Sequence, residues 1–264
     1  MQVKWEGVMP AVTTKFDEND ALDLKMFEVN IKAQLEAGVN GIILGGTLGE
    51  ASTLTDDEKV TLIRETVRIV DNKIPVIINV AEQTTKGAIK AAAIAKENGA
   101  SGLMMLPPMR YKANDFETVT YFKEVANSTD LPIMVYNNPV DYGIEVTLDM
   151  FEELLACENI QAVKESTRDI SNVTRLKNKF GDRIKILCGV DTLALESMVA
   201  GADGWVAGLV AAYPAETVAI YKLVKSGDIL TKDVFLRTNH CRCSKCLNKI
   251  TKFTALRGIA DKPT

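Results

Sequence analysis

The sequence lacks the features that mark several large classes of protein. Its longest apolar run, residues 198–212, is too short for a transmembrane helix and contains Asp203. The first ten residues have no apolar core of a secretory signal. Five cysteines among 264 residues do not indicate a disulfide framework. These absences predict a cytoplasmic protein that does not associate with a membrane.

Charge and composition exclude further classes. The formal net charge of −4 argues against a nucleic-acid-binding body. A chain with 47% hydrophobic and 25% charged residues is typical of a folded protein and neither disordered nor collagen-like. The length suits one large α/β barrel or two smaller domains.

One short pattern occurs three times along the chain. A glycine, a small or β-branched residue, a polar residue and a second glycine precede an apolar run at residues 37–44, 98–105 and 200–207. The first glycine of each copy (Gly38, Gly99, Gly201) suits the left-handed position after a helix. The apolar run suits a strand that is buried on both faces. The spacings of 61 and 102 residues predict two and four βα units between copies.

Apolar runs of strand length alternate with amphipathic stretches of helical length. The expected strands are 8–13, 42–46, 76–80, 103–106, 133–136, 160–164, 184–188 and 205–209. The expected helices are 22–36, 56–70, 85–98, 116–128, 148–156, 170–179 and 193–200. Strands that alternate with helices predict right-handed crossovers and a parallel sheet. Eight such strands predict an α/β fold of the (β/α)8 TIM-barrel type. The alternative is an open doubly wound sheet, which is disfavoured because no GxGxxG follows the first strand.

The end of the chain differs from the rest. We therefore divide the sequence into a barrel domain, residues 1–225, and an atypical basic segment, residues 226–264. Residues 237–264 contain seven Lys and Arg, one acidic residue and three of the five cysteines. A metal site would use His240, Cys241, Cys243 and Cys246, but their spacing lacks the pairs typical of structural zinc. A divergent, truncated or frameshifted end is the favoured interpretation.

In a TIM barrel the catalytic residues lie at the carboxyl ends of the strands. The polar residues expected there are Thr47, Glu50, Tyr136, Lys164 and Asp191. A lysine in a buried strand loses hydration, so its pKa falls and a neutral amine becomes available to attack a carbonyl carbon. The alternative is a lysine just beyond the strand that pairs with Glu50 or Glu165.

Two further features at these strand ends have both a functional and a structural interpretation. Tyr136 is either a proton donor and acceptor or a strand aromatic with a satisfied hydroxyl. The glycine-rich turn at residues 45–49 either cradles a carboxylate or phosphate with its N–H groups or is only a turn. Phosphate is disfavoured because the loops after strands 7 and 8 contain no Lys or Arg.

Taken together, these segments resemble the dihydrodipicolinate synthase/N-acetylneuraminate lyase family of class I aldolase-type barrels. The matching segments are GVMPAVTTKF, GGTLGEASTLTDDEK, YNNP, VKEST and CGVD followed by GADGWVAG. They occur in the family's order over about residues 1–225.

The resemblance implies a metal-free and cofactor-free lyase that acts on a 2-oxo acid. It implies that Lys164 forms a Schiff base, that Tyr136 shuttles protons, and that Thr47 positions Tyr136. The N–H groups of Thr47 and Leu48 would hold the substrate carboxylate. Other residues implied to line the pocket are Gly46, Gly189 and Val206. The resemblance also implies a homo-oligomer, either a tetramer or a dimer.

The chain departs from the synthases of this family at three positions. Leu48 replaces a hydroxyl residue, Asp141 replaces the arginine that binds the second substrate, and Arg110, next to Tyr111, replaces an interface tyrosine. A carboxylate in place of that arginine disfavours a partner that resembles aspartate semialdehyde. Asp141 and Asp191 are instead candidate binders of substrate hydroxyls, or solvated loop carboxylates.

We therefore expect aldol cleavage or condensation, dehydration or deamination of a 2-oxo acid. The YNNP turn and Asp141 are similar to hydroxyproline-pathway members that deaminate a hydroxy-pyrroline carboxylate. Three alternatives stay open. The chain could be a genuine 4-hydroxy-tetrahydrodipicolinate synthase that condenses pyruvate with aspartate semialdehyde, or a non-catalytic small-molecule-binding barrel. The third is a protein whose basic tail contacts metal or nucleic acid.

Overall fold

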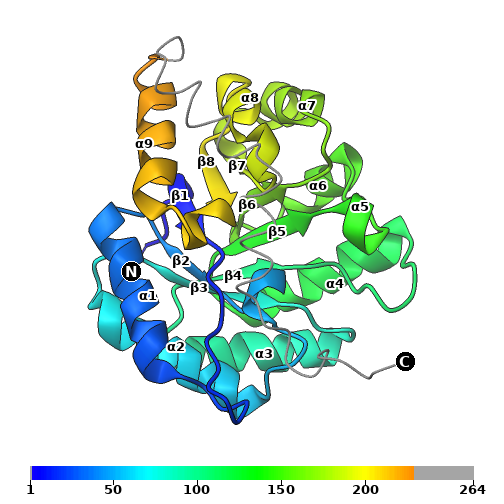
Figure 1. The fold of residues 1–264 in the computed structure, drawn as a ribbon. Helices are drawn as coiled ribbons and strands as arrows, with labels where there is room; N and C mark the ends of the chain where they lie inside the picture. Colours follow the sequence, from blue (N-terminus) through cyan, green and yellow to red (C-terminus); the bar gives the residue numbers. More distant parts are fainter. Residues whose placement is uncertain (1, 229–264) are drawn as a thin grey trace, which may run out of the picture.

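Eight parallel strands form the centre of the computed structural model, which describes residues 2–228 (Figure 1). The strands are β1 (Gly7–Pro10), β2 (Ile42–Leu44), β3 (Val76–Val80), β4 (Gly102–Met105), β5 (Ile133–Asn137), β6 (Ile160–Glu165), β7 (Lys185–Cys188) and β8 (Gly204–Ala207). The α-helices are α1 (Leu24–Ala37), α2 (Asp56–Val70), α3 (Thr85–Glu97), α4 (Asp115–Ser128), α5 (Pro139–Tyr142), α6 (Leu148–Leu154), α7 (Ser171–Phe180), α8 (Ala194–Val199) and α9 (Pro214–Lys225). Four single 3-10 turns are also described, η1 (Thr47–Gly49), η2 (Gly181–Arg183), η3 (Asp191–Leu193) and η4 (Leu209–Ala211).

The sheet closes on itself. Its strand order is β1-β8-β7-β6-β5-β4-β3-β2, and all of these pairs are parallel. A bridge between Ala11 and Ile43 joins the two ends, where the amide of Val12 donates to the carbonyl of Ile43 at 3.1 Å. The predicted TIM barrel is therefore confirmed, and the open doubly wound sheet is wrong.

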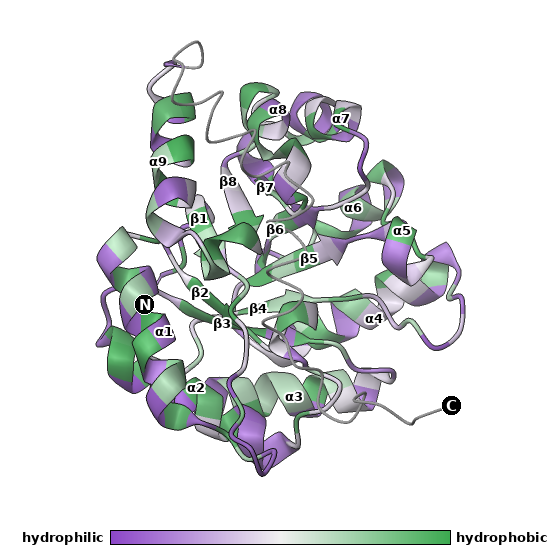
Figure 2. Ribbon diagram, in the orientation of Figure 1, coloured by the Kyte–Doolittle hydropathy of each residue, from purple (hydrophilic) through white to green (hydrophobic). Residues whose placement is uncertain are grey.

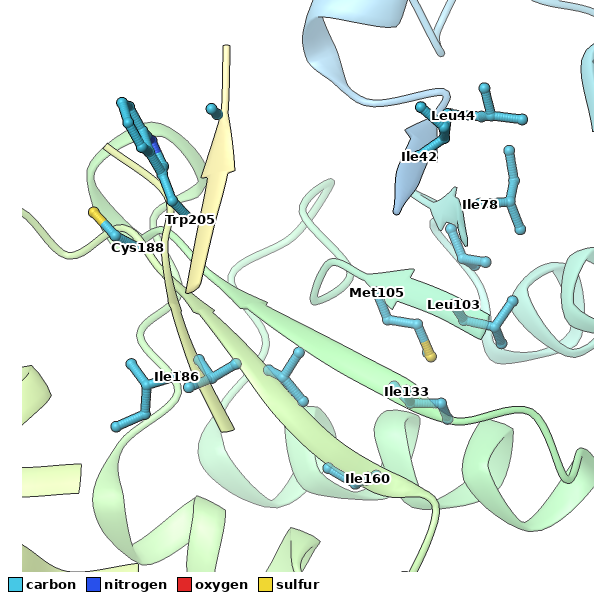
Figure 3. Close-up of a cluster of buried hydrophobic side chains, with 14 of the residues drawn as sticks. Ile42, Leu44, Ile78, Leu103, Met105, Ile133, Ile160, Ile186, Cys188 and Trp205 are labelled. Atoms are coloured by element: carbon cyan, nitrogen blue, oxygen red, sulfur yellow. The ribbon is translucent and has the colours of Figure 1, made fainter. Parts of the chain in front are cut away.

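Side chains that alternate along each strand build two apolar layers. One layer fills the barrel and includes Met9, Ile43, Ile77, Met104 and Leu187. The other lies between the strands and the surrounding helices (Figure 3), and its labelled members are Ile42, Leu44, Ile78, Leu103, Met105, Ile133, Ile160, Ile186, Cys188 and Trp205. Figure 2 shows that the strands are mainly hydrophobic, while the helices carry both hydrophobic and hydrophilic residues.

The helix ends follow the local sequence signals. Thr55 caps α2 in a reciprocal capping box with Glu58, so the orphan N–H groups of the first turn are satisfied. The three glycines of the repeated pattern have positive φ, at 82° for Gly38, 90° for Gly99 and 110° for Gly201. The copies of the pattern lead into β2, β4 and β8, as the spacing predicts. The sequence reasoning missed α5 and α9, and α9 packs between α8 and α1 in the outer ring.

The basic tail lies almost wholly outside the described residues. His240, Cys241, Cys243 and Cys246 fall in this part, so the structure does not address the suggested metal site. Within residues 2–228, no group of three or more His, Cys, Asp or Glu is arranged to hold a metal ion. No helix in this range is long and apolar enough to cross a membrane.

The seam between β1 and β8 depends on two glycines that face each other in register, Gly7 and Gly204. A Cβ on Gly204 would lie 2.6 Å from the carbonyl oxygen of Gly7. We expect Gly204→Ala to lower the free energy of unfolding by about 3 kcal/mol or more, because backbone atoms cannot move aside cheaply. The measurement is chemical denaturation. The control is Gly143→Ala, where φ is 74° and the space is open, with an expected loss of about 1 kcal/mol. A smaller loss for Gly204→Ala than for the control would contradict this account.

Candidate active site

The amine of Lys164 lies inside the barrel. Lys164 follows Ala162 by two residues on β6, so both side chains face the interior, and only 7% of Lys164 is exposed. Its Nζ lies 3.7 Å from the ring centroid of Tyr136 on the neighbouring strand β5. Burial lowers the pKa of the Lys164 amine to about 8, against the opposing electrostatic influence of Tyr142 and Asp191. A larger fraction of this amine is therefore neutral at pH 7 than of an exposed lysine.

The space for this lysine comes from a glycine on the adjacent strand. A Cβ on Gly189, just after β7, would lie 2.8 Å from Cγ and 2.9 Å from Cε of Lys164 and would overlap Oγ of Ser166. Gly189 thus lies beside the lysine, where the sequence analysis expected a pocket residue. Val206 of β8 is also buried in the layer that fills the barrel.

A row of hydroxyl groups leads away from Lys164. The Tyr136 and Tyr142 rings meet edge to face, with centroids 5.5 Å apart at 84°. Each phenol affects the pKa of the other, so the two hydroxyls lie close together, and Tyr142 Oη lies 2.8 Å from Oγ1 of Thr47. Burial is the main cause that raises the pKa of both phenols, so both stay protonated near neutral pH. The hydroxyl of Thr47 therefore reaches Tyr136 through Tyr142, a residue that the sequence analysis did not identify.

A polar network leads from Tyr136 in another direction. Nδ2 of Asn138 donates to the Tyr136 hydroxyl at 3.2 Å and to the Asp141 carboxylate at 2.8 Å. The other oxygen of Asp141 accepts a hydrogen bond from Nη2 of Arg168 at 3.2 Å. Asp141 therefore forms an ion pair with an arginine from the loop after β6. Arg168 is a second residue that the sequence analysis missed.

The turn after β2 presents backbone N–H groups beside these hydroxyls. Gly46 precedes the single turn η1, whose first residues are Thr47 and Leu48. The first N–H groups of a helical turn have no acceptor within that turn. Two hydrogen bonds fix the loop, from Nδ2 of Asn79 to the Gly45 carbonyl at 2.9 Å and from Oγ1 of Thr14 to the Gly49 carbonyl at 2.7 Å.

Asp191 is half-buried and accepts three hydrogen bonds. Its carboxylate receives the Trp205 indole N–H at 3.0 Å, the Gly208 amide at 3.1 Å and the Leu209 amide at 2.8 Å. Burial raises the pKa of this carboxyl, while these donors oppose the shift. Protein donors therefore engage this carboxylate, and its role as a binder of a substrate hydroxyl stays a prediction. The side chain ties the loop after β8 to β7.

A cavity of about 290 Å³ adjoins the hydroxyl row, and Thr47 and Tyr142 form part of its wall. Lys59, Glu82 and Leu106 also line it. Tyr111, in contrast, is 78% exposed and borders a separate hollow with Arg110.

The site therefore offers a partly neutral amine, a neutral phenol against it, a path of hydroxyls and a turn of backbone donors. A neutral amine can add to a carbonyl carbon, and an adjacent phenol can supply and remove the protons of that addition.

Both the sequence and the fold are similar to those of known proteins. The sequence model of the dihydrodipicolinate synthetase family matches residues 4–259. A 4-hydroxy-tetrahydrodipicolinate synthase of Exiguobacterium sibiricum is 34% identical over 227 residues, which cover 86% of this chain and 78% of that protein. The 4-hydroxy-tetrahydrodipicolinate synthase of Methylacidiphilum fumariolicum SolV has a TM-score of 0.90 at 26% identity, with 99% of this chain and 89% of that chain covered. The dihydrodipicolinate synthase of Acinetobacter baumannii, solved as a complex with pyruvate, has a TM-score of 0.85 at 26% identity, with coverages of 89% and 80%.

The lowered pKa of Lys164 predicts an unusual pH dependence of its reactivity. The amine is protonated below its pKa of about 8 and nucleophilic above it. We expect competitive acetylation with acetic anhydride to modify Lys164 with a midpoint near pH 8. A lysine model peptide in the same tube, with a pKa of about 10.4, is the reference. A shared midpoint for both amines would rule out the effect of burial on this lysine.

Proposed function

The chain belongs to the dihydrodipicolinate synthetase family, and from that premise we propose that it is a lyase that binds a 2-oxo acid as a Schiff base on Lys164. The observation that carries the proposal is the buried amine of Lys164 against the face of Tyr136. A metal-free reaction of this class needs a nucleophilic amine and a proton carrier beside it. Both groups come from adjacent strands of a rigid barrel, where catalytic sites of this fold lie.

The first chemical step is addition of the amine to the substrate carbonyl. The nitrogen lone pair of Lys164 forms a bond to C2 while the carbonyl oxygen takes a proton from the Tyr136 phenol. The nitrogen then returns a proton to the Tyr136 phenolate, and the phenol passes this proton to the new hydroxyl. Departure of that hydroxyl as water leaves an iminium ion on Lys164 and a phenolate on Tyr136. The iminium accepts the electron pair of a bond at the neighbouring carbon, so that this bond can break or form. The ring face of Tyr136, 3.7 Å from Nζ, also favours a positive charge at the nitrogen.

The proton that Tyr136 gives and takes needs a path. Tyr142 and Thr47 supply hydroxyls in sequence, and both border the adjoining cavity. A proton can therefore pass from the reacting centre to the cavity along side chains of one chain. The amides of Thr47 and Leu48 lie at the start of η1, where they would hold the substrate carboxylate.

A second candidate is the synthase reaction itself. The sequence argument against it rested on Asp141 in place of an arginine. Because Asp141 is paired with Arg168 at 3.2 Å, its carboxylate does not stand alone at the mouth, and a guanidinium is present there. Condensation of pyruvate with aspartate semialdehyde therefore stays a candidate beside cleavage, dehydration and deamination. Assembly into a tetramer or dimer and a cytoplasmic location stay predictions.

Borohydride trapping tests the covalent step. Incubation with pyruvate followed by reduction should convert the imine to a stable secondary amine on the peptide that contains Lys164, as read by intact mass and peptide mapping. Lys164→Met should abolish the adduct. Lys185→Met is the matched control, because Lys185 lies at the opposite end of the barrel strands, at the start of β7. Folded protein that gives no adduct with pyruvate would overturn the assignment for that substrate. Longer hydroxylated 2-oxo acids would then distinguish a selective pocket from a barrel that only binds ligands.

Removal of the Tyr142 hydroxyl tests the proton path. In deuterium oxide, enamine formation exchanges the methyl protons of pyruvate, and proton NMR follows their loss. We expect Tyr142→Phe to slow this exchange by roughly a hundredfold, the usual contribution of a positioned proton carrier. Tyr111→Phe is the matched control and should exchange as the wild type does. An unchanged rate for Tyr142→Phe, or a loss only in Tyr111→Phe, would assign the path to other groups.

A further inference from the structure

We propose that Arg168 binds a second negatively charged group of the substrate, a carboxylate at the far end of the carbon chain from C2. The inference rests on the proposed function, because the far end is defined by the attachment of C2 to Lys164. The preferred ligand is then a 2-oxo diacid or another substrate with the same terminal carboxylate.

Arg168 lies in the loop that follows β6, the strand that contains Lys164. It follows Lys164 by four residues, and its Nη2 reaches across to Asp141 of α5. Asp141 is linked through Asn138 to the hydroxyl of Tyr136. The charge of Asp141 also acts on the amine of Lys164. The guanidinium is therefore linked through Asp141 and Asn138 to the phenol that faces the Lys164 amine.

The backbone at Arg168 is in an unfavourable conformation. Its φ is 66°, in the left-handed region that glycine enters without cost and a side chain of this size rarely adopts. Flanking hydrogen bonds hold the loop, from the Thr167 amide to Glu165 at 2.8 Å and from the Asp169 amide to Thr167 at 3.2 Å. Strain of this kind persists where a side chain serves the site and the surrounding structure enforces it.

The charges around Arg168 leave its guanidinium able to accept an anion. Asp141 uses one oxygen for Arg168 and the other for Asn138. The other carboxylate of the loop, Asp169, is engaged by Arg175 at 2.7 Å and by Ser171 at 2.6 Å. A guanidinium has five N–H donors, and the contact with Asp141 uses Nη2. The side chain of Arg168 is 53% exposed, so an incoming carboxylate can reach it.

The test compares matched pairs of 2-oxo acids in the trapping assay. The pairs are 2-oxoglutarate with 2-oxopentanoate and 2-oxoadipate with 2-oxohexanoate, which differ by a terminal carboxylate against a methyl group. The quantity is the ratio of the concentrations that half-saturate adduct formation on Lys164 within each pair. We expect the wild type to favour at least one diacid by roughly tenfold or more, as a charge-assisted hydrogen bond provides.

Arg168→Gly should abolish this preference, and glycine suits the φ of 66°, so the variant should fold. Arg175→Ala is the matched control, because it removes a cation of the same region that is engaged with Asp169, and its ratios should equal those of the wild type. A wild type without preference in either pair, or a preference that survives in Arg168→Gly, would overturn the inference. Absence of any adduct, pyruvate included, would instead overturn the proposed function, and the inference would fall with it.

Discussion

The burial of one amine constrains the rest of this site. A lysine inside a packed barrel loses hydration, which disfavours its ammonium form. Within residues 2–228, the surrounding residues reduce the free-energy cost of burying the ammonium form, and they do so without a salt bridge to the amine. Small residues on its own strand and the next, Ala162 and Gly189, leave room for the side chain. The face of Tyr136 offers a weak attraction to a cation in place of a salt bridge. The amine can thus be neutral or protonated near neutral pH, and the proposed role of a nucleophile that later carries positive charge requires both forms.

Tyr136 joins two networks that differ in chemistry. One side leads through Tyr142 and Thr47, which are neutral hydroxyls that can both give and receive a proton. The other side leads through Asn138 to the ion pair of Asp141 and Arg168. An amide cannot relay a proton at neutral pH as readily as a hydroxyl. The second network therefore orients the Tyr136 phenol and does not remove its proton. In the proposed mechanism, the hydroxyl network carries the proton and the amide network orients the phenol.

The sequence alone predicts the barrel and the position of Lys164 because both depend on local periodicity. The repeated glycine pattern reports helix ends, and the apolar run from Ile160 to Lys164 reports a buried strand that a cation interrupts. Tyr142 and Arg168 could not be found in this way. Tyr142 meets Thr47 across 95 positions of sequence, and the loop geometry that joins them has no periodicity. For Arg168, the one available signal is its place four residues beyond Lys164, and the positive φ that makes it unusual is not visible in the sequence.

The contact between Asp141 and Arg168 changes the electrostatic meaning of an acidic residue at this position. Read alone, an acidic residue at the barrel mouth repels an anionic partner. Read with Arg168, it belongs to a neutral pair whose cation comes from the β6 loop instead of the β5 loop. The proposed anion-binding group thus lies on the loop after β6, next to the loop after β5. In the proposed imine, C2 of the substrate is attached to Lys164. A guanidinium on the loop after β6 would therefore bind a substrate whose carbon chain extends in one direction from C2, and a guanidinium on the loop after β5 would bind a chain that extends in another. The position of the cation around the barrel therefore says more about the substrate than its residue type does. This position selects the length and the direction of the substrate's carbon chain.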